Sequence, residues 1–61
     1  MQNLTARELT AIEDTLGQEM NLVKKYKMYA SATTDPQLKT KCEEIATKHQ
    51  NHYNTLMGHL C

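Results

Sequence analysis

The sequence predicts an all-α fold, an antiparallel two-helix hairpin in which residues 1–61 form a single domain. Apolar residues recur at alternating spacings of three and four along most of the chain, which is the period of a helix. One strong break interrupts them, the stretch TTDP at residues 33–36. No segment shows the two-residue alternation that is typical of strands. Because the break is short, we expect the two helices to pack side by side.

The first helix is expected over about residues 5–32. Thr5 and Glu8 fit the capping box that opens many helices. Residues spaced 3, 4, 3, 4, 3 and 4 apart form one heptad seam: Leu9, Ile12, Leu16, Glu19, Val23, Tyr26 and Ala30. Gly17 raises an alternative, a helix broken in two, because glycine in a helix costs about 1 kcal/mol relative to alanine. The seam passes Gly17 in phase and favours one helix, in which Gly17 would allow close approach of a neighbouring helix.

The second helix is expected over about residues 36–57. Asp35 can cap it, Pro36 suits its first position, and Gly58 suits its end. Its seam residues are Leu38, Cys42, Ile45, His49, His52 and Leu56. In an antiparallel pair, facing residues have numbers that sum to about 68. Glu19 is then level with His49, and His52 lies one turn further along.

Three polar residues therefore interrupt the two seams at the same place: Glu19, His49 and His52. A buried carboxylate or imidazole needs partners, so we expect the three to satisfy one another directly, through water or through a metal. One interpretation is a hydrogen-bonded cluster that fixes the register of the helices. The other is a site for a transition metal such as iron or zinc, because His-x-x-His places both imidazoles on one helical face. Glu19 would supply an oxygen ligand.

A single hairpin leaves apolar residues beside its seams without cover: Met20, Leu22, Met28, Tyr29, Ala46 and Tyr53. A chain of this length buries little surface alone. We therefore expect a homodimer in which two hairpins form a four-helix bundle. Cys42 and Cys61 are 19 residues apart, or about 28 Å along a helix, too far for a disulfide. A reducing intracellular location is expected from this.

The composition argues against several classes of function. Seven basic and seven acidic residues give no electrostatic reason to expect nucleic acid or an anionic membrane as a partner. No apolar run of about 18 residues predicts a membrane span, and the N-terminal residues do not resemble a secretory signal. Phosphate-binding loops, Cys-x-x-Cys pairs and Ser/His/Asp arrangements do not occur. We assign no catalytic residue and do not expect an enzyme, since so short a hairpin offers little material for a cleft.

Three segments resemble small spore coat proteins of endospore-forming anaerobes: KKYKMYA (24–30), DPQLK (35–39) and HQNHYNTL (49–56). These are short relatives of the coat F family, with a ferritin-like helical character. The ferritin-like pattern has a glutamate on the first helix, matched by Glu19, and Glu-x-x-His on the second, matched by His52. His49 stands where the second glutamate is expected, so the chain departs from the pattern at a ligand position.

The resemblance implies a ferritin-like four-helix bundle and a structural or assembly role as a dimer. It also implies the spore coat as a location and other coat proteins as partners. The alternative function is ferritin-like metal binding through the Glu/His site, with residual redox activity left open.

Overall fold

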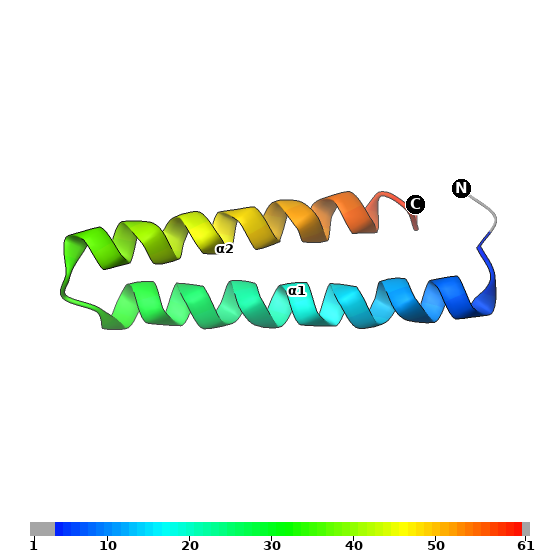
Figure 1. Cartoon of the computed structure of the whole chain (residues 1–61), viewed down its shortest axis with the longest axis horizontal. Helices are drawn as coiled ribbons and strands as arrows, with labels where there is room; N and C mark the ends of the chain where they lie inside the picture. The colour runs from blue at the N-terminus through cyan, green and yellow to red at the C-terminus, as the bar shows by residue number, and fades with distance from the viewer. Residues whose placement is uncertain (1–3, 61) are drawn as a thin grey trace.

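The computed structural model describes residues 4–60 and contains two helices, α1 (Ala6–Ala32) and α2 (Pro36–Met57). Within residues 4–60 there is no strand. The helices lie side by side and antiparallel, so that the start of α1 and the end of α2 meet at the same end of the molecule (Figure 1). The predicted all-α hairpin is confirmed, with helix bounds that agree with the sequence to within one residue. Its pairing with a second copy stays a prediction.

Local side-chain chemistry sets where both helices begin. The Thr5 hydroxyl accepts a hydrogen bond from the Glu8 backbone N–H at 3.1 Å, and the Glu8 carboxylate accepts one from the Thr5 N–H at 2.9 Å. This is the predicted capping box. At α2, the Asp35 carboxylate accepts from the backbone N–H groups of Gln37 and Leu38 at 2.9 and 3.3 Å. Both caps satisfy donors that have no partner inside the helix.

Gly17 lies within the uninterrupted helix α1, which confirms one helix rather than two. Our expectation that Gly17 admits a neighbouring helix is wrong for the hairpin. A Cβ atom placed on Gly17 would meet nothing within 4 Å. The residue is exposed, so α2 passes on another side of α1.

In the part of the chain that the structure describes, the core is a narrow stripe between the helices, made of one buried polar residue, Glu19, and five apolar ones: Leu16, Val23, Ala30, Cys42 and Ala46. The predicted seam is wrong at Ile45, because Ala46 is 2% exposed whereas Ile45 is only half-buried. Ala46 lies four residues after Cys42 and three before His49, so it shares their face of α2. Its small side chain fits where two helices touch.

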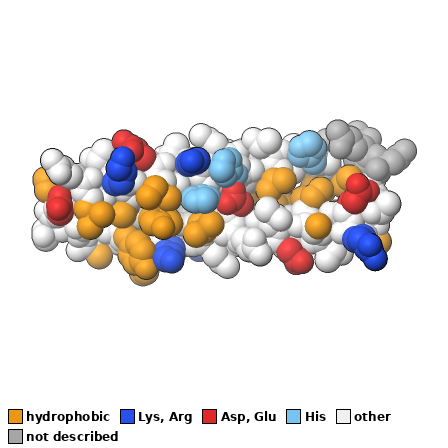
Figure 2. Space-filling model, viewed as in Figure 1, with side chains coloured by type: hydrophobic (Ala, Val, Ile, Leu, Met, Phe, Trp, Pro, Cys, Tyr) orange, Lys and Arg blue, Asp and Glu red, His pale blue; other side chains and the backbone are white. Residues whose placement is uncertain are grey.

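Apolar side chains also remain outside this stripe. Leu9 and Leu38, which we expected to face the core, are 39% and 51% exposed because each lies in the first turn or so of its helix, near an end of the hairpin. Met28 and Tyr29 are 61% and 43% exposed. On the face shown in Figure 2, hydrophobic side chains flank the histidine cluster on both sides. A single hairpin thus buries one stripe and leaves a second apolar surface uncovered.

Cys42 is a free, buried thiol. Cys61 lies outside the described residues, so the absence of a bridge between the two cysteines stays a prediction. Among residues 4–60, neither helix is long and apolar enough to cross a membrane.

Candidate metal site

Among residues 4–60, Glu19 is the one charged residue that is buried, at 8% exposure. It lies between Leu16 and Val23 along the seam of α1, so the heptad spacing that buries these two also turns Glu19 towards α2. A carboxylate in such a position is costly unless donors surround it. The residues that face it on α2 therefore decide whether the position is tolerable.

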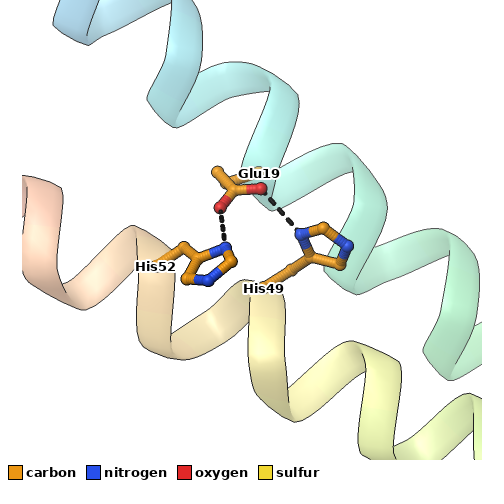
Figure 3. A group of neighbouring side chains, drawn as sticks. All are labelled: Glu19, His49 and His52. Atoms are coloured by element: carbon orange, nitrogen blue, oxygen red, sulfur yellow. Dashed lines mark hydrogen bonds and ion pairs between the residues drawn. The ribbon is translucent and has the colours of Figure 1, made fainter.

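Two histidines face Glu19, and each places a ring nitrogen beside one carboxylate oxygen. His49 Nδ1 lies 2.7 Å from Glu19 Oε1, and His52 Nδ1 lies 2.9 Å from Glu19 Oε2 (Figure 3). The His49 contact is a short hydrogen bond to a carboxylate, whereas the His52 nitrogen lies within ion-pair distance of its oxygen. In the described part of the chain, every buried side-chain nitrogen or oxygen has a partner. The structure thus brings together all three residues that the sequence singled out, and they satisfy one another directly. We refer to Glu19, His49 and His52 as the Glu/His cluster.

The three side chains differ in their contact with solvent. The Glu19 side chain is 11% exposed, that of His49 is 23% exposed, and that of His52 is 52% exposed. We expected His52 to lie in the core, and for the hairpin this is wrong. His52 follows His49 by three residues, which rotates it away from the centre of the contact stripe towards its edge. The cluster is therefore buried at Glu19 and exposed to solvent at His52.

An aromatic side chain that we expected on the seam of the first helix, but not as part of the cluster, also contacts the cluster. The ring of Tyr26 stacks on that of His49, with 6.5 Å between centroids and 14° between planes. Tyr29 meets Tyr26 edge-on at 5.7 Å. The Lys25 ammonium lies 5.9 Å and 5.8 Å from the Tyr26 and Tyr29 centroids, within reach of both ring faces. The signal in the sequence was the place of Tyr26 on the seam, one heptad after Glu19.

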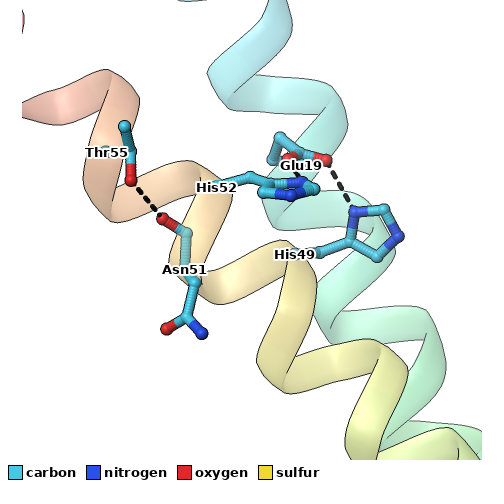
Figure 4. Close-up of polar contacts among 5 residues, drawn as sticks. All are labelled: Glu19, His49, Asn51, His52 and Thr55. Atoms are coloured by element: carbon cyan, nitrogen blue, oxygen red, sulfur yellow. Dashed lines mark hydrogen bonds and ion pairs between the residues drawn. The ribbon is translucent and has the colours of Figure 1, made fainter.

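Polar neighbours on the outer side of α2 take no part in the cluster. Thr55 donates its hydroxyl to the Asn51 backbone oxygen at 3.0 Å, one turn back along the helix (Figure 4). That bond is a local one of the kind that serine and threonine make within helices. The contacts of Glu19 with the two histidines thus connect the two helices, whereas the bond between Thr55 and Asn51 lies within α2.

The cluster has the donor types and the spacing of a metal site. One ligand atom from each of the three residues can be chosen so that all lie within 4.8 Å of one another. Two imidazoles on one tetrahedral zinc ion would have centroids about 5.2 Å apart for a Zn–N bond of about 2.05 Å. The rings of His49 and His52 lie 5.7 Å apart at 87°. The residues present therefore fit a first-row metal ion with small side-chain movements.

Insertion of an ion would lengthen the present contacts between Glu19 and the two histidines. Two ligand atoms on a tetrahedral zinc ion lie about 3.3 Å apart. The present nitrogen–oxygen distances are 2.7 and 2.9 Å, so Glu19 and the histidines would separate by about half an ångström. Half-exposed His52 can supply that movement without disturbing the core.

No protein-family model, curated protein or solved structure matches this chain. The resemblance to spore coat proteins therefore stays a prediction, as does metal binding at the Glu/His cluster.

Proposed function

We propose that this chain binds a first-row transition-metal ion through Glu19, His49 and His52. The observation that carries the proposal is the convergence of three donor atoms within 4.8 Å, from two helices. Two nitrogens and one carboxylate suit zinc, iron, copper or nickel better than calcium or magnesium, which prefer oxygen. Three protein ligands leave a coordination position for water or another ligand, and the exposure of His52 keeps that position accessible.

The competing explanation is that the cluster only fixes register. A polar group in a helical seam can specify alignment at some cost in stability, and each Glu19 oxygen already has a histidine nitrogen at 2.7 or 2.9 Å. The two explanations differ in their response to metal. A register device is complete without an ion, whereas a metal site gains stability from it by mass action.

The test is metal analysis of untagged protein together with thermal unfolding in the presence of zinc or, without oxygen, iron(II). At a free ion concentration of about 100 times Kd, the parent should gain about 2.7 kcal/mol. His52→Ala should lose most of this response, because it removes a ligand while His49 remains bonded to Glu19. His59→Ala is the matched control, since His59 lies beyond α2 and outside the cluster, and it should respond like the parent.

Metal-free parent protein whose melting temperature ignores each ion would leave the register explanation in place. Equal responses of His52→Ala and the parent would place the ion elsewhere on the chain.

A second candidate function is that of a helical building block, a homodimer assembled as a four-helix bundle. The exposed apolar side chains support it: Leu9, Met28, Tyr29 and Leu38. The chain exposes 4700 Å², whereas a compact monomer of 7.0 kDa exposes about 4000 Å². The difference of about 700 Å² is close to the 800 Å² or so that each partner buries in a standard interface. The spore coat, with other coat proteins as partners, is the setting that the sequence resemblance suggests for such a unit.

Light scattering after size exclusion tests the dimer, and the expected mass is about twice the 7.0 kDa of one chain. A folded monomer at low micromolar concentration would contradict it. Repeating the measurement with Met28→Asp and Tyr29→Asp locates the interface, because charges on an apolar contact surface should shift the equilibrium towards monomer.

A further inference from the structure

The Glu/His cluster has an outward side as well as an inward one. Both histidines use Nδ1 to contact Glu19, which leaves Nε2 as the nitrogen on the far side of each ring. In Figure 3 the two Nε2 atoms point away from Glu19 and away from each other. The His52 side chain is 52% exposed, so this outward nitrogen belongs to the surface that a partner would meet.

Glu19 determines which ring nitrogen carries the proton in the metal-free chain. An ionised carboxylate accepts hydrogen bonds and has none to donate. The Nδ1 atoms of His49 and His52 lie 2.7 and 2.9 Å from Glu19 oxygens, too close for two lone pairs to face each other, so an ionised Glu19 favours an N–H on each Nδ1. A neutral imidazole has a single N–H, so both Nε2 atoms are left as acceptors with a free lone pair.

A metal ion in the cluster reverses this arrangement. The nitrogens that converge on Glu19 are the Nδ1 atoms, and a metal bond requires the Nδ1 lone pair, so that proton has to leave. A neutral ring then carries its proton on Nε2. Resting on the metal binding proposed above, we propose that metal loading switches His49 and His52 from the Nδ1–H to the Nε2–H tautomer. The outward-facing Nε2 atom of each ring, which forms the outer edge of the cluster, thereby changes from a hydrogen-bond acceptor to a hydrogen-bond donor.

The exchange balances without any co-reactant. One proton leaves Nδ1 and one is taken up at Nε2 of the same ring, with water as the carrier, and the ring remains neutral. The metal ion adds its own charge to the cluster and forms bonds with the Nδ1 atoms. Consequently the metal-loaded edge favours partners that present carboxylate or backbone carbonyl oxygens, whereas the metal-free edge favours partners that present N–H or O–H groups.

Long-range proton–nitrogen correlation spectra of isotope-labelled histidine read the tautomers directly. Metal-free protein, measured with its histidines in the neutral form, should show His49 and His52 as Nδ1–H. One equivalent of zinc should convert both to Nε2–H with a metal-shifted Nδ1. His59, outside the cluster, serves as the internal control and should keep its pattern.

The outcomes separate this inference from the proposed function. Zinc uptake through Nε2, or metal-free rings already in the Nε2–H form, overturns the switch while metal binding stands. Absence of zinc uptake overturns both.

Glu19→Gln provides a second measurement on the metal-free chain. The glutamine amide has one oxygen that accepts and one NH₂ group that donates, so it can match only one Nδ1–H histidine. One ring should keep the Nδ1–H form and the other should adopt Nε2–H, with Nδ1 as acceptor. Two Nδ1–H rings in a folded Glu19→Gln variant would show that the carboxylate does not set the tautomers, and would refute the reasoning. Circular dichroism checks that the variant keeps its helices.

Discussion

Replacement of Gly17 by alanine should stabilise the hairpin. Glycine loses more backbone freedom on folding than alanine does, and inside a helix the difference is about 1 kcal/mol. Gly17 lies near the middle of α1, with several turns of helix on either side. A Cβ atom there would meet nothing within 4 Å, so no steric cost opposes the gain. The expected change is an increase of about 1 kcal/mol in the free energy of unfolding, or about 4–8 °C in melting temperature.

Gly58→Ala is the matched control. Gly58 is the C-cap of α2 and has φ −60°, a conformation that alanine adopts readily. A Cβ atom at Gly58 would lie 3.2 Å from the Thr55 carbonyl oxygen and 3.8 Å from that of Asn54. Because those oxygens belong to the backbone, they can retreat only slightly. The control variant should gain nothing or lose stability, although it makes the same chemical change.

The assay is urea unfolding followed by circular dichroism, at one protein concentration for all variants because dimerisation would make stability depend on concentration. Equal slopes of free energy against urea are needed for a direct comparison. A Gly17→Ala variant with unchanged or lower stability would refute the argument that this position faces open space. It would indicate instead that another chain packs closely against α1 there.

Two further predictions concern the core and the first cap. Val23→Ala should lower the free energy of unfolding by about 2 kcal/mol, because Val23 is 2% exposed. Met28 is 61% exposed in the single hairpin, so at a protein concentration low enough to keep the chain monomeric Met28→Ala should change this free energy by less than about 0.5 kcal/mol. Equal effects of the two variants in urea unfolding under these conditions would contradict the observed core. The Thr5 backbone N–H and hydroxyl hold the pKa of the Glu8 carboxyl below its usual 4.5. The stability that Glu8 contributes is therefore complete above pH 4.5 and is lost as the pH falls through the lower pKa of the folded state. In this acidic range the melting temperature of Glu8→Gln should therefore depend less on pH than that of the parent does. Parallel curves would argue against the cap.

The helix ends were predictable because they depend on a few neighbouring residues. Thr5 with Glu8, and Asp35 ahead of α2, each bond to backbone groups within three positions. The pairing of Glu19 with His49 was predictable too, because a short connection between antiparallel helices leaves little freedom of register. In these cases the physical cause is local or follows from one geometric constraint.

The remaining features depend on how the helices rotate about their own axes. A rotation of part of a turn decides whether Ile45 or Ala46 faces the core, and heptad counting does not resolve it. The same rotation places His52 at the edge of the contact rather than inside it. The stacking of Tyr26 on His49 depends further on the side-chain rotamers of both rings. These outcomes follow from packing of the whole interface, which spacing along one helix does not describe.

The order in which the hairpin closes follows from the positions of its contacts along the chain. The Lys39 ammonium donates to the Ala30 carbonyl oxygen across a separation of nine residues, whereas Glu19 and His49 are thirty residues apart. Closing the longer loop costs about 1 kcal/mol more in chain entropy. Folding should therefore zip from the turn and reach Glu19 after the rate-limiting barrier. A metal ion bound at the Glu/His cluster would therefore act mainly on unfolding. It would lengthen the lifetime of the folded chain and leave the rate of folding nearly unchanged.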